Sequence, residues 1–236
     1  MTTSTTPTPT RRRRTTAAAA ALILAAALVG GAPAAGAFAH QSTPAPVSTH
    51  EVSETLQPEP TSPTVYEFGE TLAGLEGREL EITFLAEIIP HHQAAIEMAQ
   101  LELERGTSPD IRTHAENIIA NQEHQIDQFT RWLEDWYGLS PEEAMDEAPE
   151  EARQEMVTLE EETQAMIAEL EEMSAGEDFD VAFVQKMIPH HQGGIVESLE
   201  PQSRAPHPQL RVAAMAGITT QQAQVADFRT WLAGRD

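Results

Sequence analysis

The chain has 236 residues, no cysteine, and 38 acidic against 14 basic side chains, so its formal net charge at pH 7 is −24. This charge argues against nucleic acid or an anionic membrane as a partner, because both would repel the protein. Without cysteine there are no disulfides and no thiolate ligands, so a bound metal would need nitrogen, oxygen or thioether ligands.

Residues 1–39 have the layout of a secretory signal peptide. Arg11 to Arg14 precede an apolar run of 13 residues from Ala17 to Val29, and small-residue cleavage patterns follow. The run is shorter than the about 20 residues that a membrane span needs. We therefore expect cleavage, a secreted or extracytoplasmic location (periplasm or cell envelope) and no stable membrane insertion afterwards. An uncleaved anchor is the alternative.

Residues 40–78 are predicted to form a disordered tether. They are rich in Pro, Ser, Thr and Glu and offer few apolar side chains for burial. The remaining stretch, residues 79–236, has the size of one ordinary domain.

An internal repeat of 99 residues organises this domain. Residues 79–135 align without a gap on residues 178–234, and both copies contain the sequence IPHHQ, at Ile89–Gln93 and Ile188–Gln192. In each copy, apolar residues fall at helical spacing in two successive stretches. Each copy therefore predicts a hairpin of two helices.

Local signals mark where the helices begin and end. Gly106 and Thr107 interrupt the first hairpin, Ser108 is a good N-cap, and Pro109 suits the first position of a second helix. Between the copies, residues 140–143 form a capping box, and a helical crossover is predicted over residues 141–173. No stretch alternates as a strand would. We predict an all-α, ferritin-like four-helix bundle built from two duplicated hairpins and a helical crossover.

Each copy places a proline before its two histidines, at Pro90 and Pro189. Proline inside a helix costs about 3 kcal/mol or more, because it lacks the N–H that bonds four residues back. Either the helix kinks at this point, or it begins there. In the second case the helix N-terminus would hold the imidazoles neutral, and neutral imidazole is the form that binds metal.

If the hairpins pair about a pseudo-twofold axis, His91 and His92 could face His190 and His191 across the bundle. Met98 and Met187 lie on the same helix sides as these histidines. Imidazole with thioether and no thiolate favours copper, with Cu(I) the softer preference. Alternatively, the histidines form a polar step satisfied by glutamines, and the methionines only fill the core. Two pairs in the same register, each beside a proline, favour the metal site.

The stretches FLAEIIPHHQAAIEMA and FDVAFVQKMIPHHQGGI, followed by FTRWL and FRTWL, resemble the family known as domain of unknown function 305. The resemblance spans about 79–234. It implies an exported, ferritin-like helical protein connected with copper binding and copper resistance. Its ligand pattern maps onto six residues: His91, His92, Met98, Met187, His190 and His191.

The chain departs from that family pattern near both histidine pairs. Glu87-Ile88 and Lys186-Met187 stand where the family usually has a methionine pair, and Glu197 replaces the later methionine of the second copy. These changes make Cu(II) or zinc alternatives to Cu(I), with Glu97 or Glu197 as a nearby oxygen ligand.

We therefore expect a secreted protein that is not an enzyme and that sequesters or transfers copper through the paired histidines. The metal ion is the expected partner, and the sequence identifies no protein partner. One alternative is a metal-free helical interaction module. Another is a ferritin-like metal oxidase, although no histidine is preceded by the acidic residue that the Glu-x-x-His motif requires.

Overall fold

The computed structural model describes residues 56–235, and within this range the chain is helical and contains no β-strand. The all-α prediction is confirmed. The predicted signal peptide, residues 1–39, lies outside the described residues. None of the helices described is long and apolar enough to cross a membrane. The helices are α1 (Pro63–Gly74), α2 (Gly77–Arg105), α3 (Pro109–Tyr137), α4 (Pro141–Glu147), α5 (Glu150–Glu172), α6 (Glu177–Glu197), α7 (Leu199–Arg204) and α8 (Pro208–Ala233).

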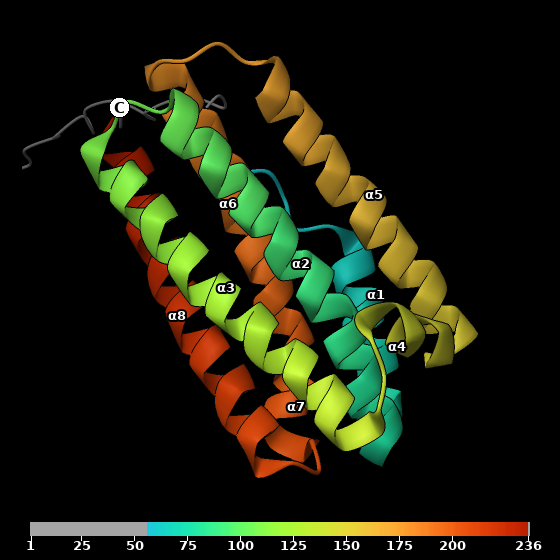
Figure 1. Cartoon of the computed structure of the whole chain (residues 1–236). Coiled ribbons are helices and arrows are strands. Elements are labelled where there is room, and N and C mark those ends of the chain that lie inside the picture. Colours follow the sequence, from blue (N-terminus) through green and yellow to red (C-terminus); the bar gives the residue numbers. More distant parts are fainter. Residues whose placement is uncertain (1–55, 236) are drawn as a thin grey trace, which may run out of the picture. The chain divides into compact units, whose positions relative to one another are not determined.

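The first helices of the two hairpins, α2 and α6, pack against each other at the centre (Figure 1). α3 packs on α2 and α8 packs on α6, which completes a ferritin-like four-helix bundle. α1 and α5 contact each other, and α5 also contacts both central helices. The predicted crossover over residues 141–173 consists of two helices, because α4 ends before Ala148 and Pro149.

The prediction of a disordered tether over residues 40–78 is wrong in part, because residues 63–74 form the helix α1. The Ser62 hydroxyl accepts from the backbone N–H of Thr64 at 3.1 Å, and a proline occupies the first helical turn. Val65, Phe68 and Leu72 lie on one face of α1 and are buried in the core. Proline here starts a helix, which is its favoured place, and does not indicate disorder.

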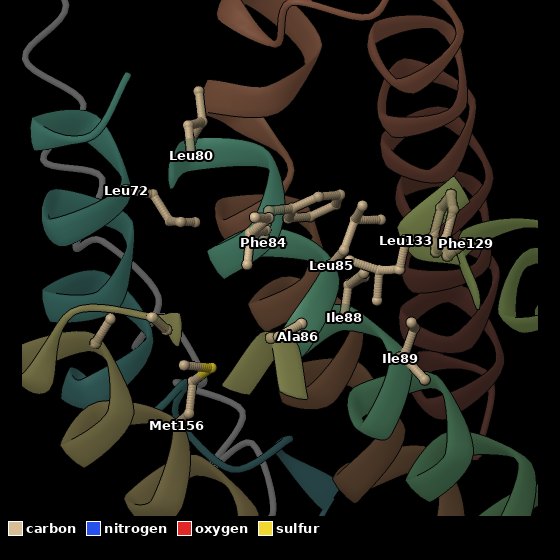
Figure 2. Close-up of a cluster of buried hydrophobic side chains, with 14 of the residues drawn as sticks. Leu72, Leu80, Phe84, Leu85, Ala86, Ile88, Ile89, Phe129, Leu133 and Met156 are labelled. Carbon is tan, nitrogen blue, oxygen red and sulfur yellow. The ribbon is translucent and has the colours of Figure 1, made fainter. Parts of the chain in front are cut away.

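The core consists of two apolar clusters. Figure 2 shows the first, in which Leu72 of α1 and Met156 of α5 lie with side chains of α2 and α3, among them Phe84 and Phe129. The second cluster contains Phe183, Phe228 and residues from the later part of α2. Along α2, the paired histidines fall between the residues of the first cluster and those of the second.

Glu81 and Asp180 occupy equivalent positions in the two copies, and each caps the second helix of the other hairpin. Asp180 Oδ1 accepts from the backbone N–H groups of Thr107 and Ser108, both at 2.9 Å, and its Oδ2 accepts from the Thr107 hydroxyl at 2.9 Å. Glu81 Oε1 accepts from the backbone N–H of His207, the N-cap residue of α8, at 2.7 Å. These reciprocal caps hold the hairpins in register.

The hairpins differ at the end of their first helix. α2 runs on to Arg105, whereas α6 ends at Glu197 and the short α7 follows. Pro201 accounts for this break, because it has no N–H to bond to the carbonyl of Glu197. Glu197 consequently lies at the end of α6, with its side chain buried.

Candidate metal centre

The IPHHQ stretches lie within continuous helices. α2 runs through Pro90 and α6 runs through Pro189, so the alternative in which a helix begins at the proline is wrong. The histidines therefore sit in mid-helix, away from any helix N-terminus. Whatever keeps their rings neutral must come from their surroundings in the core.

The two histidine pairs meet where α2 and α6 pack together. The ring centroids of His91 and His190 are 4.0 Å apart. His92 and His191 lie 6.0 and 6.2 Å from the ring of their respective neighbour in sequence. Each of these outer rings also packs near a phenylalanine of its own hairpin, His92 at 6.0 Å from Phe129 and His191 at 6.4 Å from Phe228. The arrangement therefore has the pseudo-twofold character that the repeat predicts.

Burial keeps all four imidazoles neutral. It lowers the pKa of His92 to about 3 and that of His191 to about 4. For His91 and His190, burial and then a neighbouring histidine hold the pKa well below its usual range. Neutral imidazole can offer a lone pair to a metal at any pH near neutrality.

Most of the ring nitrogens lack a hydrogen bond of normal geometry. This holds for Nε2 of His91 and for both nitrogens of His92, His190 and His191. The nearby amides of Gln125 and Gln224 partly oppose the fall in the pKa of His92 and His191. Buried polar atoms without protein partners are uncommon in folded proteins, and a bound ion or water can satisfy them.

Two buried carboxyl groups lie beside His91. Glu87 is one helical turn before His91 on α2, and Glu197 is the last residue of α6. The Oε2 atom of Glu197 is 3.6 Å from Nδ1 of His91. One potential ligand atom from each of Glu87, His91 and Glu197 lies within 4.8 Å of the other two. This is a cluster of metal-ligand type formed by two helices that are distant in sequence.

The two carboxyl groups hold protons more strongly than usual. Burial raises the pKa of Glu87 to about 7, and the contact with Glu197 opposes this rise. Burial, followed by the charge of Glu87, raises the pKa of Glu197 well above its usual value. A cation placed between them would reverse this effect, because it stabilises the ionised carboxylates.

The predicted thioether ligands lie in the second apolar cluster. Met98 and Met187 are both fully buried there, among residues such as Phe183 and Phe228. Their role as metal ligands stays a prediction. Glu97, considered from the sequence as an oxygen ligand, is exposed at the rim of a cavity that Glu87 and His91 also line.

Two consecutive glycines let α6 approach His91 closely. A Cβ atom at Gly194 would lie 2.9 Å from Nε2 of His91 and 2.6 Å from Oε1 of Gln221. A Cβ atom at Gly193 would lie 3.5 Å from both Cε1 of His91 and Oε1 of Glu197. Gly194 therefore makes room for the imidazole and for the amide behind it.

A groove of about 650 Å³ lies between α3 and α8, which run side by side on the face of the bundle away from α5 (Figure 1). The two helices touch at both ends of the groove. Trp136 stacks on His207 with ring centroids 3.8 Å apart, and His114 contacts Phe228 at 5.0 Å. The groove is rich in glutamines from both helices: Gln122, Gln125, Gln128, Gln209, Gln221 and Gln224. Two of these glutamines, Gln125 and Gln224, interact with His92 and His191, so the groove lies next to the histidine layer.

Sequence reasoning missed Glu87 as a candidate ligand and named Glu197 only as an alternative to Glu97 for a nearby oxygen ligand. A signal for Glu87 was present, because a residue four before a histidine shares its helix face. The proximity of Glu197 to His91 depends on the pairing of α2 with α6, which no local pattern specifies.

The model of the family described as Domain of unknown function (DUF305) matches residues 81–232. A search of curated proteins found no match. Among solved structures, CopM in its Cu(I)-bound form is similar to 65% of this chain over 96% of its own length, with 24% identity and a TM-score of 0.53. CopM in its Cu(II)-bound form matches with 23% identity and a TM-score of 0.51, over 65% of this chain and 97% of its own. A DUF305 fragment from Deinococcus radiodurans matches 75% of this chain over its full length, with 24% identity and a TM-score of 0.50. These likenesses show a shared fold.

Proposed function

The chain belongs to the family described as domain of unknown function DUF305, and from this premise we propose that it is an exported protein that binds copper without catalysing a reaction. In this proposal the histidine layer between α2 and α6 holds the ion. The protein then sequesters copper, or passes it on, outside the cytoplasm.

One observation carries the proposal. Four buried imidazoles from two helices gather in one layer, the central pair with ring centroids 4.0 Å apart, and seven of their eight ring nitrogens lack a hydrogen bond of normal geometry. Burying polar atoms without partners costs stability. A bound ligand would offset this cost for the four buried imidazoles. Imidazole is a good ligand for copper in either oxidation state.

The comparisons support the same metal. CopM, a protein of similar fold, has been solved in Cu(I)-bound, Cu(II)-bound and Ag-bound forms. The predicted signal peptide supports an extracytoplasmic location. The lack of any Glu-x-x-His motif supports a binding role over a ferritin-like oxidase, which uses that motif twice.

The test is a copper titration of the full chain against a competing chelator, with elemental analysis. We expect tight binding by the natural protein, and its loss when His91, His92, His190 and His191 are all changed to alanine. Because these side chains are buried, helix content must be compared by circular dichroism. A variant with only His91→Gln and His190→Gln disturbs the packing less and is expected to weaken binding strongly.

The matched control replaces two other histidines, His114→Ala and His124→Ala, and should leave copper affinity unchanged. Equal copper affinity in the natural protein and a folded variant without the four buried histidines would reject the proposal. A protein that takes up no metal and forms a stable complex with another protein would favour the metal-free interaction module.

A further inference from the structure

The histidine layer is chemically different on its two sides. On the side covered by α1 and α5, Glu87 and Glu197 lie beside His91. The position equivalent to Glu87 in the second copy holds Lys186, and the position equivalent to Glu197 in the first copy holds Met98. Lys186 is engaged elsewhere, since its ammonium group pairs with the carboxylates of Glu59, at 3.1 Å, and Glu169, at 2.5 Å. The duplication has therefore left two acids on one side of the layer only.

These acids are not used by the rest of the fold. Oε2 of Glu87 and both carboxyl oxygens of Glu197 are buried without a hydrogen bond of normal geometry. Glu197 is 1% exposed and Glu87 is 6% exposed. The Nε2 atom of His91 and the ring nitrogens of His190 beside it are likewise unpartnered. Because one potential ligand atom from each of Glu87, His91 and Glu197 lies within 4.8 Å of the other two, these unpartnered groups gather in one place.

There is room for a cation with part of its hydration. A cavity of about 180 Å³ adjoins Glu87 and His91 and is also lined by Met156 and Leu159 of α5. One water takes up roughly 30 Å³, so waters could complete a coordination shell that the protein fills only in part. The two carboxylates would balance the charge of a divalent ion, and paired charges are tolerated in a core where a lone one is not.

We propose that Glu87, His91 and Glu197, with His190 next to them, form a mixed oxygen–nitrogen site that selects a borderline divalent cation, Cu(II) or Zn(II), over Cu(I). Carboxylate and imidazole are the ligands that Zn(II) and Cu(II) accept, whereas Cu(I) is favoured by thioether and thiolate sulfur. This inference rests on the proposed function, because His91 and His190 belong to the histidine layer. It assigns new ligands and an ion class to that site.

The experiment compares Zn(II) and Cu(II) titrations in air with Cu(I) titrations under anaerobic, reducing conditions, each against a competing chelator. The variants are Glu87→Gln and Glu197→Gln, which keep side-chain shape and remove the negative charge. We expect each to weaken Zn(II) and Cu(II) binding by about 100-fold while Cu(I) affinity changes much less. Glu160→Gln, an exposed acid of α5 that lines the same cavity, is the matched control and should leave these affinities unchanged.

A second variant, Glu197→Met, gives this copy the residue that Met98 provides in the other copy. It is expected to shift the preference from Cu(II) towards Cu(I), which a merely structural role for Glu197 would not do. Unchanged Zn(II) and Cu(II) affinities in both glutamine variants would overturn the inference. If the histidine variants still abolished copper binding in that case, the proposed function would survive. If the natural chain bound no metal, both would fall.

Discussion

Asp180 and Glu81 are equivalent residues of the two repeats and have the same structural role, since each acid caps the second helix of the opposite hairpin. Glu87 and Lys186 are also equivalent, yet one is a buried acid beside His91 and the other a base paired with two glutamates. The two copies are thus alike where they hold the hairpins together and unlike around the histidines.

This contrast separates what the fold requires from what the site selects. A helix start needs an acceptor for its unpaired N–H groups, and any acid at that place will serve. The residues next to the imidazoles are not needed for capping, so they can diverge. Their divergence makes one side of the histidine layer acidic, while a lysine and a methionine occupy the positions equivalent to Glu87 and Glu197.

Removing one of these caps is expected to have the largest effect on stability. Asp180→Ala removes the acceptor of three hydrogen bonds and leaves the N–H groups of Thr107 and Ser108 unpaired, which should lower the free energy of unfolding by about 3 kcal/mol. Urea denaturation of the metal-free protein measures this loss. Asp180→Asn keeps an oxygen for both backbone N–H groups and should cost about 1 kcal/mol.

The equivalent variant, Glu81→Ala, tests whether the caps are really alike. Glu81 also contacts the His207 ring at 2.6 Å and the hydroxyl of Tyr137, so its loss should be at least as large. A loss below about 1 kcal/mol at either acid would contradict the idea that these reciprocal caps hold the two hairpins together.

The glycine on α6 is expected to matter less for stability and more for binding. Gly194→Ala places a methyl group 2.9 Å from the present position of His91 Nε2, so the imidazole must move. We expect about a 10-fold loss of copper affinity, or about 1.4 kcal/mol. The free energy of unfolding should change by less than this, since a better helix former offsets part of the crowding.

Ala95 is the equivalent residue on α2, and Ala95→Gly is the reciprocal control. It should cost about 1 kcal/mol of stability through helix propensity and leave copper affinity unchanged. Equal affinities for the Gly194→Ala variant and the natural protein would mean that His91 is free to move and that the close approach of α6 does not shape the site.

The features that could be predicted from the sequence are those that depend on local patterns or on the repeat. Ser108 and Ser140 cap their helices as expected, because a hydroxyl before a helical stretch acts within a few residues. The bundle itself follows from copying one hairpin twice. The meeting of His91 with His190 follows from pairing equivalent helices about a pseudo-twofold axis.

The features that could not be predicted depend on contacts between distant segments. Val65, Phe68 and Leu72 look too few for a stable helix until other parts of the fold cover them. Neutrality of the histidines was attributed in one alternative to a helix N-terminus, but burial in the bundle causes it. Glu87 and Glu197 are 110 residues apart, and only tertiary packing brings them to the same imidazole.

The smallest expected effect concerns the buried residue Glu102. The equivalent residue of the second copy is Pro201, so only the first copy has an acid at this position. Burial and then the neighbouring Asp180 raise the pKa of Glu102 to about 9. The folded protein therefore keeps a proton that the unfolded chain loses above its ordinary pKa of 4.5. Stability should fall as pH rises between these two values, because the folded state binds more protons there.

Glu102→Gln removes this proton-binding difference. From pH 7 to pH 8, where the folded state still holds this proton, the natural protein should lose about 1.4 kcal/mol more stability than the variant, as one proton per molecule requires. Denaturation of the metal-free proteins at both pH values measures the difference. Other buried acids contribute equally to both proteins and cancel.

Glu104→Gln, on the exposed side of the same helix, should behave like the natural protein. If the natural protein and Glu102→Gln lost stability in parallel, Glu102 would be ionised in the folded state, and Arg112, whose charge lowers its pKa, would outweigh the burial.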